Sequence, residues 1–228
     1  MKRVLVDVDT QVDFVELHGA LHVPVSPSVR DTIERMLRAA PRDYDAVIGS
    51  VDSHAYDAWE FAENGGPFPP HCVKGTPGWL RVWHELPRRI RFVPMMAVTD
   101  QRVTMVVGED REGAGNRVFD AAALVREARQ GVGLYFEKEV YSLFSNPAAE
   151  PVVETLAREL TAEDPDGVVF DVIGYCTGGY CVDAAARELA LRGHRVRIFG
   201  GATAPLGGDE GVATTRRLCA EHGVQWLP

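Results

Sequence analysis

Cys181 follows an apolar segment and a Thr/Gly turn, and a helix-forming segment begins at it. This pattern places a thiol in the first turn of a helix, at the carboxyl end of a buried strand. Because a helix N-terminus favours negative charge, we expect the position to lower the thiol pKa and to make the sulfur a nucleophile. Cys176 lies inside the strand end instead, so we interpret it as a buried packing residue.

Ionisable residues also follow three other predicted strands. They are Asp9, Asp52 and Lys138. Ligands of open parallel sheets bind beyond the carboxyl ends of the strands, so we predict that these side chains and Cys181 meet at one edge of a sheet. Asp7 shares the strand face of Asp9, but it lies within the strand, where an unpaired carboxylate is costly.

These residue types can hydrolyse an amide. Cys181 attacks a carbonyl carbon, and Asp9 accepts the thiol proton and later returns it to the leaving amine. Lys138 holds positive charge beside both groups, which stabilises the thiolate and orients the carboxylate. In the turn before the nucleophile, we expect the backbone N–H groups of Thr177 and Cys181 to bind the oxyanion, before water hydrolyses the thioester.

A second set of residues has the spacing of metal ligands. Asp52 and His54 lie on one side of an extended segment, because side chains alternate with a period of two. His71 follows, and Glu60 and Glu63 lie between them. Two imidazoles with carboxylates suit Zn, Mn or Fe(II).

Short apolar segments alternate with segments of helical periodicity. Strands are predicted over residues 4–8, 46–51, 133–137, 168–174, 196–199 and 224–227. Helices are predicted over residues 28–40, 151–160, 181–191 and 210–221. Near-continuous apolar strands that alternate with helices indicate an α/β fold, with a mainly parallel sheet covered on both faces.

The segment 92–117 departs from this alternation. Residues 92–98 and 103–107 predict an inserted β-hairpin (about 92–108), and residues 108–117 predict a polar loop. No linker, repeat or low-complexity stretch divides the 228 residues, so we expect a single domain over residues 1–228.

The composition excludes several classes of partner. A net charge of −9 argues against nucleic acid, because phosphate contacts need clustered Lys and Arg. The first residues lack the character of a signal peptide, and no segment approaches membrane-spanning length, so we expect no membrane partner. Four cysteines without zinc-ribbon spacing or disulfide density favour a reducing, cytoplasmic setting.

Taken together, the motifs resemble the nicotinamidases of the isochorismatase-like cysteine hydrolases. The resemblance extends from about residue 4 to about 205 and is weakest across 85–132. It depends on the order and spacing of these motifs: Asp9-x-Gln11-x-Asp13-Phe14, Gly19-Ala20-Leu21-His22-Val23-Pro24, Asp52-x-His54, Pro70-His71-Cys72-Val73, Lys138 and Gly174…Thr177…Cys181-Val182.

The resemblance implies a Rossmann-like, three-layer α/β/α sandwich and an Asp–Lys–Cys triad of Asp9, Lys138 and Cys181. It implies a divalent metal ion (Zn, Mn or Fe), which binds the pyridine nitrogen of the substrate in nicotinamidases. The implied activity is hydrolysis of nicotinamide to nicotinate and ammonia, in NAD salvage.

The resemblance also implies further site residues. The metal ligands are Asp52, His54 and His71, with Glu63 as the fourth protein ligand and Glu60 as the alternative. Aromatic walls of the ring pocket fall on Phe14 and Phe68. The oligomeric state stays open, although members of the superfamily often self-associate.

Two departures from the family pattern keep other functions open. The turn between Thr177 and Cys181 holds three residues rather than two, and the 92–117 insertion can reshape the pocket. One alternative is a cysteine hydrolase acting on another small amide, such as a ureido, carbamoyl or heteroaromatic carboxamide compound. A second is an inactive homologue that binds a small molecule or a metal.

Overall fold

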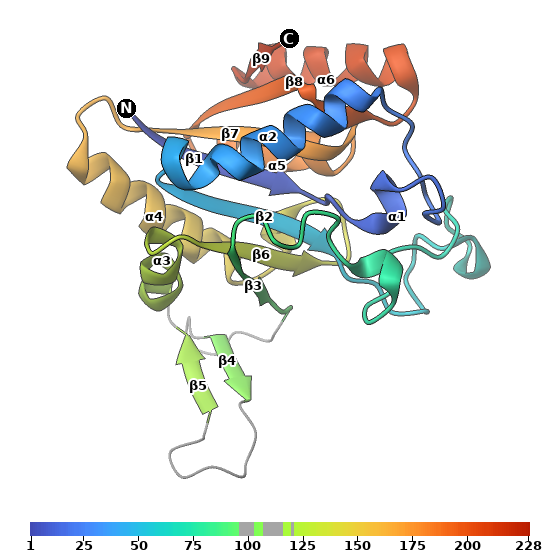
Figure 1. Ribbon diagram of the computed structural model, residues 1–228, viewed down its shortest axis with the longest axis horizontal. Helices are drawn as coiled ribbons and strands as arrows, with labels where there is room; N and C mark the ends of the chain where they lie inside the picture. Colours follow the sequence, from blue (N-terminus) through green and yellow to red (C-terminus); the bar gives the residue numbers. More distant parts are fainter. Residues whose placement is uncertain (96–102, 107–115, 120) are drawn as a thin grey trace.

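A seven-stranded, parallel β-sheet forms the centre of the molecule (Figure 1). The structure is a computed structural model that describes residues 1–95, 103–106, 116–119 and 121–228. Across the sheet the strands follow the order β3 (Arg89–Val93), β6 (Val132–Lys138), β2 (Ala46–Asp52), β1 (Lys2–Val8), β7 (Val168–Thr177), β8 (Arg195–Pro205) and β9 (Gln225–Leu227). Every pairing in this sheet is parallel.

Helices cover both faces of the sheet, which makes the three layers that the sequence predicted. One face carries α2 (Pro27–Asp43), which connects β1 to β2. The other face carries α3 (Ala121–Arg129), α4 (Ala149–Glu163), α5 (Cys181–Leu191) and α6 (Gly208–His222). Among the described residues, shorter helices lie in the connections: α1 (Val12–Val15), η1 (Ala62–Asn64), η2 (Pro77–Trp79) and η3 (Leu143–Ser145).

The apolar strands divide their side chains between two hydrophobic cores. Val4 and Val6 of β1 pack under α4 and α5, whereas Leu5 packs under α2. All ten residues of β7 are buried, because helices cover both of its faces and strands flank both of its edges. This burial explains why the strands appear in the sequence as continuous apolar segments.

The predicted hairpin was wrong in its first strand. Residues 89–93 form β3, which extends the main sheet in parallel with β6. The antiparallel pair consists instead of β4 (Val103–Val106) and β5 (Asn116–Phe119). Residues 96–102 and 107–115, over which the prediction also extended, lie outside the described residues.

Some element ends also differ from the predictions. Helix α2 continues past Pro41 to Asp43, since a proline in the last turn removes one hydrogen bond without ending the helix. Strand β7 extends three residues beyond the predicted end, to Thr177. Helix α5 spans Cys181–Leu191 as predicted. Among the described residues, no helix has both the length and the apolar character needed to cross a membrane.

Candidate active site

Four neighbouring strands deliver ionisable side chains to one edge of the sheet. Asp9 directly follows β1, Asp52 ends β2, and Lys138 ends β6. Asp52 and Lys138 are register partners, so their side chains leave adjacent strands at the same level. Cys181 begins α5 after β7, which lies on the other side of β1. Order in the sheet thus brings together residues that are up to 172 positions apart in the chain.

Lys138 lies between the other two members of the predicted triad. Its Nζ atom is 2.9 Å from Asp9 Oδ2 and 3.5 Å from Cys181 Sγ. It also forms an ion pair with the carboxylate of Asp52. All four side chains are buried, so the charges act on one another with little screening by water.

Burial determines the protonation states of Asp9 and Cys181. It raises the pKa of Asp9 to about 6, although the nearby Lys138 acts to lower it. Burial also raises the pKa of the Cys181 thiol well above its ordinary value, and Lys138 only partly opposes this. The expectation of a lowered Cys181 pKa is therefore corrected: burial outweighs the charge of Lys138, and the resting group is the thiol.

Lys138 stays charged in spite of its burial. Burial acts to lower its pKa, but the carboxylates of Asp52 and Asp9 outweigh it and hold the pKa well above the ordinary value. The site therefore keeps a permanent positive charge 3.5 Å from the sulfur.

Asp9 is held in place by its neighbour on β2. The Ser50 hydroxyl donates to Asp9 Oδ1 at 2.8 Å, and the Asp9 N–H donates to the Ser50 carbonyl at 3.1 Å. The backbone of Asp9 adopts the left-handed region, with φ of +49°, which is uncommon for a residue with a side chain.

Asp7 is neutralised elsewhere: Arg81 Nη2 and the Tyr135 hydroxyl donate to its carboxylate at 2.5 and 2.8 Å.

Two amides of the turn before Cys181 are bound by side chains of the protein. The N–H of Gly178 donates to Thr215 Oγ1 of α6, and the N–H of Gly179 donates to the Asp183 carboxylate. Thr177 is buried at the end of β7. Cys181 is the first residue of α5, where backbone N–H groups have no partner within the helix. The assignment of the Thr177 and Cys181 N–H groups as oxyanion donors stays a prediction.

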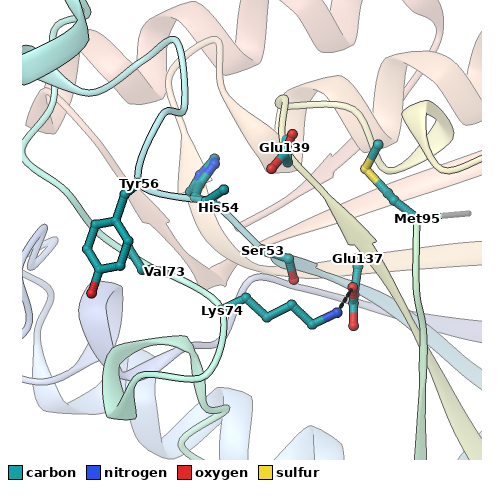
Figure 2. A pocket seen from close by; sticks show the side chains of 9 residues that line it. Ser53, His54, Tyr56, Val73, Lys74, Met95, Glu137 and Glu139 are labelled. Carbon is teal, nitrogen blue, oxygen red and sulfur yellow. Dashed lines mark hydrogen bonds and ion pairs between the residues drawn. The ribbon is translucent and has the colours of Figure 1, made fainter.

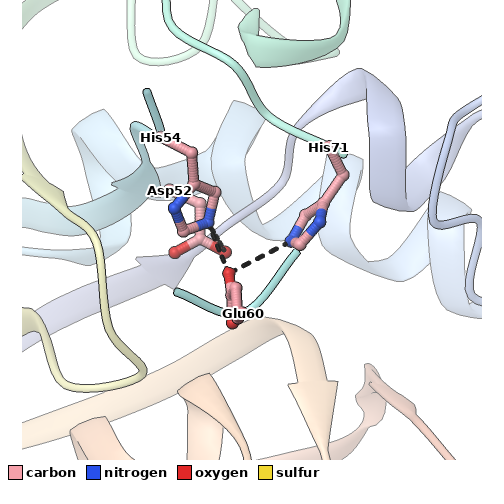
Figure 3. A group of neighbouring side chains, drawn as sticks. All are labelled: Asp52, His54, Glu60 and His71. Atoms are coloured by element: carbon pink, nitrogen blue, oxygen red, sulfur yellow. Dashed lines mark ion pairs between the residues drawn. The ribbon is translucent and has the colours of Figure 1, made fainter. Parts of the chain in front are cut away.

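A cluster of potential metal ligands lies beside the triad (Figure 3). Ligand atoms of Asp52, His54, Glu60 and His71 all lie within 4.8 Å of one another, and all four residues are buried. His54 Nε2 and His71 Nε2 are 2.6 and 3.5 Å from the same oxygen, Glu60 Oε1.

The fourth member of this cluster is Glu60 rather than Glu63. Glu63 lies on η1 and is exposed. Backbone hydrogen bonds between residue pairs 60/68 and 62/68 close the loop, which turns Glu60 inward and carries the next turn to the surface. The choice of Glu63 is corrected for this reason.

The four residues fit a divalent cation. Within the part of the chain that the structure describes, Nδ1 of the buried His54 ring has no hydrogen-bond partner, and Nε2 faces the carboxylates of Glu60 at 2.6 Å and Asp52 at 3.8 Å. His71 Nδ1 lies 2.9 Å from the Pro69 carbonyl, which leaves Nε2 facing the cluster. Two imidazole nitrogens and two carboxylates match the ligands of Zn, Mn or Fe(II).

Gln11 and Asp13 hold the ligand-bearing segments. The side-chain amide of Gln11 donates to the Asp52 carbonyl and accepts from the Asp52 N–H, both at 2.8 Å. Asp13 Oδ2 accepts from the N–H of Cys72 at 2.7 Å, where the backbone φ is +47°. This bond fixes the residue that follows His71.

Aromatic rings connect the cluster to the nucleophile. The rings of Phe14 and Phe68 lie 5.4 and 6.0 Å from that of His71. Phe68 lies 6.1 Å from Tyr180, the residue before Cys181, and Tyr180 lies 5.4 Å from Tyr141. Tyr180 and Tyr141 were not predicted as site residues, because no spacing in the sequence relates their positions to the segment that carries His54 and His71.

A cavity of about 580 Å³ opens beside His54 (Figure 2). It is lined by Ser53, His54, Ala55, Tyr56, Val73, Lys74, Met95, Glu137 and Glu139. Lys74 and Glu137 form an ion pair of 2.7 Å across it. No member of the predicted triad lines this cavity.

The chain shares its fold with known amide hydrolases. No family model matches it. A nicotinamidase/pyrazinamidase of Mycobacterium tuberculosis is 37% identical over 79 residues, which are 33% of this chain and 41% of that protein. The chain therefore spans about two fifths of that relative's length.

Solved structures match over the whole chain at low identity. A nicotinamidase from Bacillus subtilis has a TM-score of 0.65 and 23% identity over 100% of both chains. A pyrazinamidase of Pyrococcus horikoshii in complex with zinc has a TM-score of 0.62 and 19% identity, covering 100% of this chain and 99% of that one. N-carbamoylsarcosine amidase from Thermoplasma acidophilum has a TM-score of 0.57 and 20% identity, covering 100% and 96%. The α/β fold of this chain is thus that of the nicotinamidases and their isochorismatase-like relatives.

Proposed function

We propose that this chain is a metal-dependent amidase that hydrolyses nicotinamide to nicotinate and ammonia. The observation that carries the proposal is the position of Lys138, 2.9 Å from Asp9 and 3.5 Å from Cys181, directly beside the four-residue cluster. Support comes from a nicotinamidase with the same fold and from a pyrazinamidase with the same fold that was crystallised in complex with zinc.

The reaction begins with a proton transfer. As the sulfur of Cys181 attacks the amide carbon, its proton passes to Asp9, whose pKa of about 6 leaves it ionised at neutral pH. Lys138 stabilises the sulfur as it loses its proton. The N–H groups of Thr177 and Cys181 donate to the oxygen that gains negative charge.

Collapse of the tetrahedral intermediate breaks the C–N bond. Asp9 returns the proton to the nitrogen, and ammonia leaves a thioester on Cys181. Water then attacks the thioester, and Asp9 accepts a proton from this water. The C–S bond breaks, nicotinate is released, and the proton on Asp9 passes to the sulfur and restores the thiol.

The four-residue cluster is the part of the site that would bind the substrate ring. A divalent cation bound by Asp52, His54, Glu60 and His71 would supply a Lewis acid for a heteroaromatic ring nitrogen. Phe14 and Phe68 then face the ring as aromatic walls. We assign this activity to NAD salvage in a reducing cytoplasm, consistent with four buried cysteines that are all free thiols.

The test is ammonia release from nicotinamide by purified protein whose metal content has been measured, with Cys181→Ala as the control. Release by the wild type and loss in the variant are expected. No release from a metal-loaded wild type would exclude nicotinamide as the substrate.

A second candidate is hydrolysis of another small amide. It is favoured by the lengthened turn before Cys181 and by the shared fold with N-carbamoylsarcosine amidase. A panel of ureido, carbamoyl and heteroaromatic amides separates the two candidates, since the preferred substrate has the highest kcat/KM. Turnover of none of them would favour an inactive binding protein.

A further inference from the structure

The turn before the nucleophile contains two consecutive glycines in left-handed conformations. Gly178 and Gly179 have φ values of +101° and +98°. A Cβ atom on Gly178 would lie 2.6 Å from the Leu206 carbonyl oxygen, so the packing admits only glycine there. Such a pair has wide conformational freedom, and Cys181 follows only two residues later. The position of the sulfur therefore depends on whatever fixes this turn.

Two buried side chains bind both glycine amides. Thr215 Oγ1 accepts from the Gly178 N–H at 2.9 Å, and the Asp183 carboxylate accepts from the Gly179 N–H at 2.6 Å. Thr215 Oγ1 also lies 2.9 and 3.0 Å from the two oxygens of Asp183, to which it donates. Asp183 is 1% exposed and Thr215 is fully buried, so water does not replace these bonds.

These contacts differ from those of an ordinary acid in a helix N-terminus. Asp183 lies in the first turn of α5, but its carboxylate is engaged by a residue before the helix and by a side chain of α6. The Leu206 N–H adds a bond to the Thr177 carbonyl at 3.0 Å. Thr215 in the middle of α6 and Leu206 before the helix thus both support the turn.

We infer that Asp183 and Thr215 are positioning residues that hold the lengthened Thr177–Cys181 turn and thereby keep the Cys181 sulfur beside Lys138. Neither residue touches the reacting atoms. The inference rests on the proposed function to the extent that Cys181 is the nucleophile.

The test compares Thr215→Val, which removes the hydroxyl and keeps the shape, with Thr215→Ser, which keeps the hydroxyl. Thr214→Val is the matched control, because Thr214 is the adjacent threonine of α6 and binds neither amide. The first measurement needs no substrate: it is the rate of Cys181 alkylation by iodoacetamide at one pH, followed on the Cys181 peptide by mass spectrometry. The second is kcat and KM for nicotinamide.

Thr215→Val is expected to slow alkylation at least fivefold and to lower kcat at least tenfold, with KM within twofold of wild type. Thr215→Ser and Thr214→Val are expected to stay within twofold in every measurement. Thermal unfolding verifies that each variant is folded. If Thr215→Val does not fold, Asp183→Asn gives the same reading, with Asp209→Asn in the exposed first turn of α6 as its control.

Folded Thr215→Val or Asp183→Asn protein with alkylation and kcat within twofold of wild type would overturn the inference. A wild type that releases no ammonia would instead refute the proposed function, and the alkylation rates would still decide the role of the turn support.

Discussion

Asp52 and Lys138 are partners in the β2–β6 register and form a buried ion pair, and this pair joins the triad to the metal cluster. Lys138 also contacts Asp9 and lies next to Cys181, whereas Asp52 belongs to the cluster with His54, Glu60 and His71. One carboxylate thus faces both the charged Lys138 beside Cys181 and the other members of the candidate metal-binding cluster. Changes at either half of the site are therefore expected to affect the other.

The two neighbouring cysteines are expected to differ completely in function. Cys181→Ala removes the nucleophile and should lower kcat about 1,000-fold or more. Cys176→Ala removes only a buried packing group and should leave kcat within about threefold, at a stability cost of roughly 1 kcal/mol. Ammonia release and chemical denaturation measure these effects. Turnover retained by Cys181→Ala would contradict covalent catalysis by this residue.

Activity is expected to fall in acid because Asp9 must be ionised to accept the thiol proton. Its pKa is about 6, raised by burial, so the fraction of ionised Asp9 falls as the pH drops through 6. Below that pH, kcat/KM should decrease about tenfold per unit, and above about pH 7 this limb should be flat. The profile is measured on the metal-loaded enzyme with nicotinamide. A flat profile down to pH 5 would exclude Asp9 as the base with this pKa.

The two glutamates of the 60–63 segment provide a direct test of the metal cluster. Glu60→Gln removes a buried charged ligand and is expected to weaken divalent-metal binding by at least about tenfold. Glu63→Gln changes only an exposed side chain and should retain the wild-type metal content. Elemental analysis after dialysis against a weak chelator gives the comparison. Equal metal content in both variants would argue against Glu60 as a ligand.

The ion pair between Asp7 and Arg81 is expected to stabilise the fold rather than to catalyse. Arg81→Met leaves a buried, unpaired carboxylate, which should lower the free energy of unfolding by about 3–5 kcal/mol. Tyr135→Phe removes one of the hydrogen bonds to Asp7 and should cost only about 1–2 kcal/mol. Urea titrations measure both values. A similar loss in both variants would show that the charge pairing adds nothing beyond a hydrogen bond.

Local patterns in the sequence predicted the parts of the site that depend on strand order. Continuous apolar segments identified the buried strands, and Asp9, Asp52 and Lys138 follow those segments. These three residues were predicted to meet because parallel strands end at a common edge of the sheet. Cys181 was located in the same way, and α5 begins at it.

Features that depend on contacts across the chain could not be predicted in this way. Strand β3 was placed in a hairpin because its partner, β6, lies about 40 residues later. Glu60 and Glu63 are equivalent by composition, and only the closure of the loop at Phe68 separates them. The raised pKa of Cys181 reflects burial by many elements at once, which no local motif reveals.

The loop that carries Glu60 and His71 has a small apolar cluster of its own. It consists of Ala58, Phe61 and Val73 and is separate from the two main cores, whereas Cys72 packs in the core under α2. A cation bound by ligands from β2 and from this loop would act as a further cross-link between the loop and the sheet, in addition to the hydrogen bond from Cys72 to Asp13. The ion would then stabilise the loop as well as bind the substrate, and its loss would remove this link between the loop and the sheet.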